Sequence, residues 1–170
     1  MDKVYNSQLK LVSTGVCVGE RTVTTAELAK QKWAKYRIDG EREGEPVATS
    51  EQEIIDRLGV ISRPWVSERQ TRTTMFNAAL DDAIARGAQS GVSDIKGRIT
   101  VLYAASSQSQ RRIPNFLDEV SEHAGLHQNH HREFVHRACA GFNNGVNRLS
   151  QYCEQAKDLE GYAVVGAAEI

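Results

Sequence analysis

Apolar positions along the chain follow two spacings: near-continuous or β-branched runs typical of buried strands, and four-residue steps typical of helices. The strand-like runs predict four strands, at 9–18, 99–106, 132–138 and 162–170. The helix-like spacing predicts five helices, which begin near Thr24, Ser50, Thr73, Pro114 and Phe142. Because strands alternate with helices, the pattern predicts an α/β layered fold with a mostly parallel sheet, as one domain over 1–170.

Capping signals mark where the first two helices begin. Thr24 stands three residues before Glu27, and Ser50 stands three residues before Glu53, which is the spacing of a capping box. Gly59 is expected to end the second helix. The expected apolar positions of the first helix are Leu28, Trp33 and Tyr36. The polar stretch 37–48 that follows it is predicted to be an inserted loop.

The later helices carry apolar stripes. In 73–90, Phe76, Leu80 and Ile84 recur at four-residue steps, which predicts a well-buried helix. The last helix has a longer stripe, and we expect its members to be buried: Phe142, Val146, Leu149, Cys153 and Ala156.

Composition narrows the class of protein. A net charge of −1 and a sequence pI near 6.5 argue against a broad nucleic-acid or membrane surface. No run of eighteen apolar residues occurs, and the first ten residues lack the apolar core of a signal peptide. The three cysteines are scattered and odd in number, so we expect reduced thiols in a cytoplasm rather than a disulfide framework.

The segment Ala138-Cys139-Ala140-Gly141 lies where a predicted strand turns into a predicted helix. A thiol at the amino end of a helix is favoured as thiolate, the form that attacks a carbonyl carbon. Gly141 would let the backbone approach a substrate, and nearby N–H groups would hold an oxyanion. The alternative is that Cys139 is a small buried side chain, as we expect for Cys17 and Cys153.

Five histidines cluster ahead of Cys139: His123, His127, His130, His131 and His136. The spacing of His123 and His127 would suit two metal ligands on one helix face, but Gly125 interrupts the helix between them. No carboxylate or cysteine completes an evident set, so solvated loop histidines are favoured and no metal is expected. The basic pair Arg111-Arg112 is read as a solvated loop, with an acidic carrier protein or a phosphate as the alternative partner.

Four motifs, in order along 9–170, resemble the β-ketoacyl-acyl carrier protein synthase III family, which has the thiolase fold. The matching stretches are LVSTGVCVGERTVTTAELA (11–29), TSEQEIIDRLGVISR (49–63), ITVLYAASSQSQRRIPNFLDEVSEHAGL (99–126) and the ACAGF turn followed by YAVVGAAEI. The resemblance implies a decarboxylating condensation in which Cys139 accepts an acyl group from acyl-CoA or an acyl-acyl carrier protein. Malonyl-acyl carrier protein would then supply the carbanion equivalent, and no cofactor is needed.

The resemblance also implies substrate contacts at Arg57, Ile113, Gly141 and Phe142. One departure concerns CoA, because the family's CoA-stacking tryptophan falls on Glu53 here. A second departure is length: the chain matches only the first half of a family protein, and the family's catalytic histidine and asparagine lie in the other half. The alternatives are therefore a non-catalytic fragment or partner subunit, with a second chain supplying that pair, or a related thiolase-fold reaction such as a hydroxymethylglutaryl-CoA synthase-like condensation.

The resemblance implies a homodimer as well. In that family the strand that falls on 132–138 pairs with its copy across a two-fold axis, and Ile113 falls where a residue reaches into the partner's acyl pocket. The alternative for Ile113 is an ordinary contact at a helix start within its own subunit.

Overall fold

The computed structural model describes residues 9–30, 32–33, 47–106, 116–126, 130–136, 140–156 and 160–168, with backbone alone at 32–33 and 47–48. The chain forms two compact units, one made of Met1–Cys17 and Gln70–Ile170 and the other of Val18–Arg69. Each unit is described by itself. None of the described helices is both long and apolar enough to cross a membrane.

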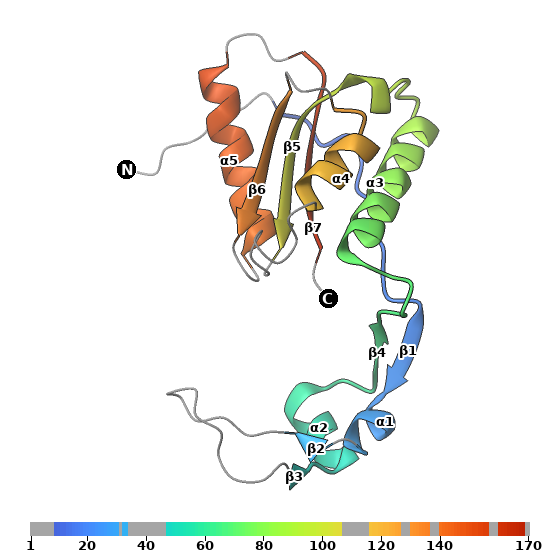
Figure 1. Ribbon diagram of the computed structural model, residues 1–170. Helices are drawn as coiled ribbons and strands as arrows, with labels where there is room; N and C mark the ends of the chain where they lie inside the picture. The colour runs from blue at the N-terminus through green and yellow to red at the C-terminus, as the bar shows by residue number, and fades with distance from the viewer. Residues whose placement is uncertain are drawn as a thin grey trace. The chain divides into compact units, whose positions relative to one another are not determined.

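A three-stranded parallel sheet is the centre of the first unit (Figure 1). Its strand order is β6-β5-β7, and the strands span His131–His136 (β6), Ile99–Ser106 (β5) and Tyr162–Ala167 (β7). In the register, Tyr103 of β5 lies opposite Glu133 of β6 and Val165 of β7. The predicted α/β class with a parallel sheet is therefore confirmed, and β5 has the predicted bounds.

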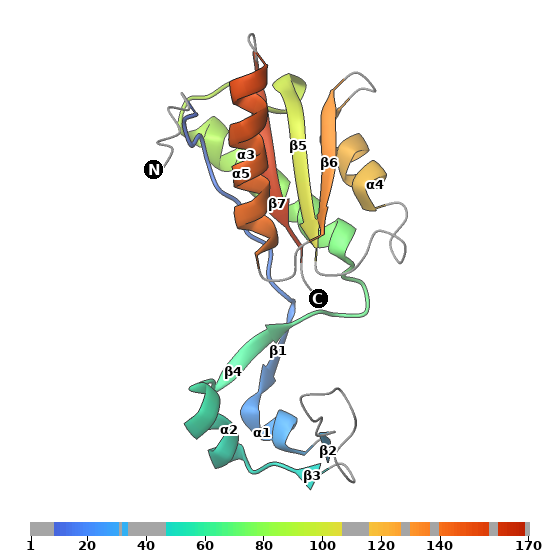
Figure 2. The same ribbon diagram turned by 90° about the vertical axis from the view of Figure 1, so that its left-hand side faces the viewer.

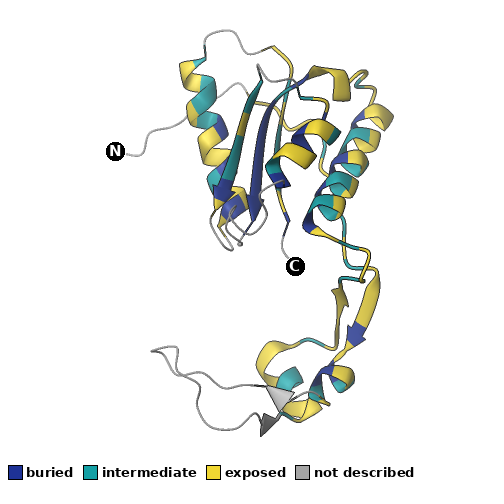
Figure 3. Cartoon of the chain, viewed as in Figure 1, coloured by how far each residue is buried: buried dark blue, intermediate teal, exposed yellow. Residues whose placement is uncertain are grey.

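Helices cover both faces of this sheet, as two views at right angles agree (Figures 1 and 2). Alternate residues of β5 point to opposite faces. Leu102 and Ala104 pack with Phe76 of α3 (Arg72–Gln89) and Phe116 of α4 (Phe116–His123). On the other face, Tyr103 packs with Leu149 of α5 (Gly141–Gln155). The burial colouring shows β5 dark blue along most of its length, as expected for a strand covered on both sides (Figure 3).

The predicted strand at 9–18 is wrong, because 9–19 has no strand or helix structure. Within the first unit this segment binds to α3 instead of to a strand. Ser13 Oγ donates to the Ala83 carbonyl at 2.7 Å, and the Val16 N–H donates to Asp82 Oδ2 at 3.1 Å. The β-branched residues of 9–18 therefore occur in an irregular segment that is hydrogen-bonded to a helix, and their strand propensity did not decide its structure.

The second unit is built on an antiparallel pair that the sequence pattern did not predict, β1 (Arg21–Thr24) with β4 (Ser62–Trp65). Helices α1 (Thr25–Ala29) and α2 (Glu51–Leu58) begin at the predicted caps, Thr24 and Ser50, whose side chains accept from the Glu27 and Glu53 N–H groups. Gly59 ends α2 in the left-handed conformation, as predicted.

The first helix is shorter than predicted. It ends at Ala29, and Trp33 lies on a short strand, β2 (Lys32–Trp33), paired with β3 (Val47–Ala48). The predicted loop 37–48 therefore ends before Val47, and 37–46 lies outside the described residues, as does Tyr36. A cap fixes where a helix begins, whereas its end depends on pairing with distant segments that a local pattern does not reveal.

Candidate functional site

Three parallel strands end at one edge of the sheet, and α5 begins there. The chain leaves β5 through α4 on one face and leaves β6 through α5 on the other. In open α/β sheets, ligands bind at the carboxyl edge where the chain changes face in this way. At this edge the described strands β5 and β6 end, at Ser106 and His136. The predicted site residues Cys139 and Ile113 belong to those segments and lie outside the described residues.

The N-cap residue of α5 gives the first turn of the helix no side-chain capping bond. Ala140 is the N-cap, and it makes no side-chain capping bond because alanine has no polar group. No acidic residue occurs in the first turn either. The N–H groups and the positive end of the helix dipole at this helix start favour a negatively charged or polar group.

The buried face of α5 differs from the predicted stripe. Gly141 and Gly145 are buried with Leu149, whereas Phe142 is 49% exposed and Val146 is 41% exposed. A Cβ on Gly141 would lie 2.9 Å from the Ala105 Cβ, so packing on β5 requires a glycine there. The stripe was wrong at this end because apolar spacing gives glycine no weight, although glycine is what lets a helix lie closest to a sheet.

The second unit contains an apolar pocket of about 500 Å³ around Arg57. Arg57 Nη2 forms an ion pair with Glu53 Oε1 at 2.9 Å, one helical turn apart on α2. The remaining lining residues come from α1, α2, β4 and the residue before the α2 cap: Leu28, Thr49, Ile54, Leu58, Arg63 and Trp65. The sequence pattern pointed to Arg57 and Glu53 but not to Trp65, although Arg63 and Trp65 are spaced to share one face of a strand.

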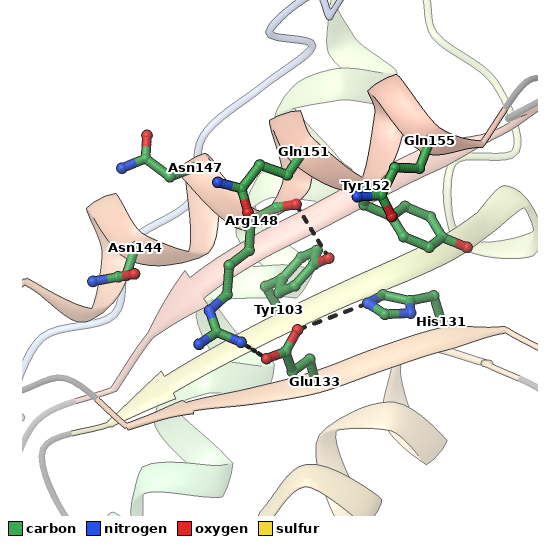
Figure 4. Close-up of a pocket in the computed structure, with 9 residues that line it drawn as sticks. All are labelled: Tyr103, His131, Glu133, Asn144, Asn147, Arg148, Gln151, Tyr152 and Gln155. Carbon is green, nitrogen blue, oxygen red and sulfur yellow. Dashed lines mark hydrogen bonds and ion pairs between the residues drawn. The ribbon is translucent and has the colours of Figure 1, made fainter.

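The first unit contains a polar pocket of about 560 Å³ between β5, β6 and α5 (Figure 4). Glu133 forms an ion pair with Arg148, whose backbone carbonyl accepts from the Tyr103 hydroxyl at 3.4 Å. The rings of His131 and Tyr152 stack with centroids 4.2 Å apart. Figure 4 shows four amide side chains along the α5 wall: Asn144, Asn147, Gln151 and Gln155. These amides recur at three- and four-residue steps, so the sequence places them on one face of the helix, and this spacing is a signal for a polar pocket that the predicted site did not include.

Burial changes the proton affinity of two groups in the polar pocket. It lowers the pKa of His131 and raises the pKa of Tyr103, because a charged imidazolium or phenolate loses hydration there. His131 Nε2 lies 4.0 Å from Glu133 Oε2, which is too far for a hydrogen bond, and this buried nitrogen has no hydrogen-bond partner among the described residues. The neutral imidazole is therefore the favoured form.

The remaining cysteine and histidine predictions concern single residues. Burial raises the pKa of the Cys153 thiol, which packs beside Tyr152 against the core, as predicted. His123 Nε2 lies 2.9 Å from Asp81 Oδ1, while His127 lies outside the described residues. Among the residues that the structure does describe, no three histidine, cysteine or acidic side chains gather as a metal would require.

Sequence comparison finds no matching family model and no matching curated protein. The fold does match solved structures. β-Ketoacyl-acyl carrier protein synthase III from Thermus thermophilus matches with a TM-score of 0.72 and 17% identity, over 95% of this chain and 43% of that one. 3-Oxoacyl-acyl carrier protein synthase III from Aquifex aeolicus matches at 0.70 and 22% identity, over 94% and 44%.

A third match is PksG, an HMG-CoA synthase from Bacillus subtilis, with a TM-score of 0.65 and 18% identity, over 93% of this chain and 34% of that one. This chain spans less than half the length of each of the three. The fold is therefore that of one half of a thiolase-like condensing enzyme, as the sequence resemblance predicted.

Proposed function

We propose that this chain is the nucleophile-bearing half of a β-ketoacyl-acyl carrier protein synthase III-like acyltransferase, with Cys139 as the nucleophile. The observation that carries the proposal is the start of α5, uncapped and at the carboxyl edge of the sheet, directly after the position of Cys139. The match covers both compact units, which supports assigning 1–170 to one thiolase-fold half.

In the proposed reaction, the Cys139 thiolate attacks the carbonyl carbon of an acyl thioester. N–H groups at the start of α5 hold the oxyanion, and collapse expels the donor thiolate, which leaves an acyl-Cys139 thioester. Loss of CO₂ from malonyl-acyl carrier protein then gives a carbanion that attacks this thioester and releases the Cys139 thiolate. No cofactor takes part.

We propose acyl-CoA as the donor that uses the apolar pocket, which Arg57 helps to line. Guanidinium groups bind phosphate through charge-assisted hydrogen bonds. Gly141 and Phe142 belong to the turn beside Cys139, and Ile113 to the segment after β5, so both segments border the same sheet edge in this proposal. The reduced thiol that the reaction requires fits a cytoplasmic location.

A partner subunit without activity of its own is the second candidate. The exposure of Phe142 and Val146 on α5 favours it, because a second thiolase-fold half would cover such an apolar stripe. That half would also supply the catalytic histidine and asparagine. The two candidates differ in whether Cys139 becomes acylated.

Mass spectrometry of the chain after incubation with acyl-CoA tests the proposal. We expect an acyl adduct on Cys139 that is absent from Cys139→Ser, and no condensation product from the chain alone, because nucleophile and base act as a unit. A chain that folds but never acquires the adduct would leave the partner-subunit candidate. Condensation product from the chain alone would show that a local residue replaces the missing pair.

A further inference from the structure

The polar pocket of the first unit holds more hydrogen-bonding groups than its own residues use. Its α5 wall carries four carboxamides, and none forms a side-chain hydrogen bond with any residue that the structure describes: Asn144, Asn147, Gln151 and Gln155. Each carboxamide has two N–H donors and a carbonyl acceptor. Steps of three and four residues place the amides in a row along one side of the helix (Figure 4). The row can therefore both donate to and accept from a ligand along its length.

The charged groups that line this pocket cancel one another. Glu133 of β6 forms an ion pair with Arg148 of α5. Burial lowers the pKa of His131, which keeps its imidazole neutral at neutral pH. A charged ligand would lose its hydration on entry and would meet no unpaired opposite charge in this lining. The pocket therefore favours a ligand that is polar but neutral.

Aromatic rings give the pocket an apolar surface among these polar groups. Tyr152 stacks on His131 with centroids 4.2 Å apart, and the centroid of the Tyr103 ring lies 5.2 Å from that of His131. Tyrosine and histidine present an apolar ring body with a polar tip. His131 Nε2 is buried without a hydrogen-bond partner among the described residues, so a ligand hydroxyl would supply the bond that it lacks.

A sugar ring matches this combination of groups. C–H groups lie on its faces, and hydroxyl groups, each both donor and acceptor, surround its edge. A volume of about 560 Å³ lies within the range of about 300–1,000 Å³ that is common for ligand pockets, so a small saccharide fits. A peptide matches less well, because its apolar side chains would lie against amides. A nucleobase needs an open aromatic face, whereas the Tyr152 and His131 rings already stack on each other.

We propose that this pocket binds a neutral saccharide. The amide row of α5 and Glu133 bond to its hydroxyl groups, and the Tyr152 ring packs against its C–H face. No residue that we propose for acyl transfer or for its substrates lines the pocket. The inference therefore goes beyond the proposed function, and saccharide binding requires no chemistry at Cys139.

The test titrates the whole ¹⁵N-labelled chain with maltose, with cellobiose and with glycerol, a polyol that has no ring. We expect at least one disaccharide to give saturable NMR shifts of Asn and Gln side-chain N–H signals, with a Kd of about 1 mM or tighter. Glycerol at equal concentration should shift them little. Gln151→Leu should weaken binding about fivefold, as expected for one lost hydrogen bond, and Tyr152→Leu should weaken it at least as much. Asn143→Leu, exposed on α5 but outside the lining, should not.

Three results would overturn the inference. The first is no saturable shift with either disaccharide at about 10 mM, and the second is equal affinity in wild type and Gln151→Leu. The third is an equal response to glycerol, which would mean an adventitious polyol only. The NMR spectrum also shows whether each variant is folded, and the exposed Gln151 keeps the test valid if Tyr152→Leu does not fold. Saccharide binding without an acyl adduct on Cys139 would support this inference and count against the proposed function alone.

Discussion

Gly145 of α5 lies against Val165 of β7 so closely that a Cβ on Gly145 would come within 2.7 Å of Val165 Cγ1. The Tyr103 Cβ would be 3.5 Å away. α5 therefore rests on the sheet through a position that has no side chain. Together with Gly141, this contact sets how close the start of α5 comes to the carboxyl edge.

Gly145→Ala should destabilise the protein. The substitution gains about 1 kcal/mol of helix propensity, but it overpacks a β-branched neighbour on a paired strand, which costs about 1–3 kcal/mol. We expect a net loss in the free energy of unfolding, measured by urea titration. Asn143→Ala, exposed on the same helix, should change it little. If Gly145→Ala instead raised the free energy of unfolding by the full gain in helix propensity, α5 would be shown to shift away from Val165 at no cost.

Arg72→Met should stabilise the protein. Arg72 is 8% exposed, and its Nε has no hydrogen-bond partner among the residues that the structure describes. It is also the first residue of α3, where the helix dipole opposes a positive charge. An apolar side chain of similar length removes the cost of burying a guanidinium whose Nε is unsatisfied within the described structure, and we expect a gain of about 1 kcal/mol or more in the free energy of unfolding. Arg86→Met breaks the exposed Arg86–Asp82 ion pair on the same helix, and it should lower the free energy of unfolding by roughly a few tenths of a kcal/mol at most. A clear loss in Arg72→Met, by thermal melts, would mean that the guanidinium has a bound anion.

His131 should make stability fall as the pH is lowered. Burial lowers its pKa in the folded state, so the unfolded chain binds the proton more tightly. The contribution is fully present above the unfolded pKa of about 6.5 and declines as pH falls below it, until the folded form is also protonated. His131→Phe keeps a ring beside Tyr152 and should lose this part of the pH profile in urea titrations. His123→Gln should retain it, and an unchanged profile in His131→Phe would contradict the assignment.

Cys139 should be the most reactive of the three thiols. The Cys153 thiol is less nucleophilic at neutral pH because burial raises its pKa, and Cys17 is half-buried. Iodoacetamide mapping on the native chain should label Cys139 first. Earlier labelling of Cys17 or Cys153 would count against a thiolate at the start of α5.

A homodimer should form through the outer edge of β6. In the described sheet β6 is an edge strand, and pairing with its copy would cover that edge. Single cysteines placed at 132–136, in a chain without its own thiols, should give one disulfide-linked dimer. Ala163→Cys on β7 should not. A monomer by sedimentation at micromolar concentration, or a cross-link at Ala163→Cys instead, would rule out this interface.

The sheet was predictable where burial on both sides makes the local pattern unambiguous. The run 99–106 is apolar on both faces because α3, α4 and α5 cover both, and its bounds followed directly. The caps Thr24 and Ser50 were predictable because their bonds span three residues. The pairing of β1 with β4 was not, since Arg21 and Trp65 are paired across a sequence separation that a local pattern does not cover.

The candidate sites divide in the same way. Arg57 and Glu53 both lie in the stretch 49–63 that carries the family resemblance, so that resemblance pointed to both, and they form an ion pair one helical turn apart. Trp65 joins them from a strand, β4, and in the polar pocket Glu133 of β6 pairs with Arg148 of α5. Such pairs depend on tertiary packing, which the spacing of residues within one element does not reveal.

The central position of β5 has a consequence for synthesis of the chain. β5, α4 and β6 are complete at His136, but the other neighbour of β5 begins only at Tyr162. Translation proceeds at about 5–20 residues per second, so one edge of the almost wholly apolar strand β5 stays unpaired for seconds until β7 has been made. The packing of Phe76 is also incomplete until then, because its ring packs against Gly166 of β7. We expect the nascent chain to be most prone to aggregation in this interval, and substitutions that slow docking of β7 should lower yield in the cell more than they lower the melting temperature of the purified protein.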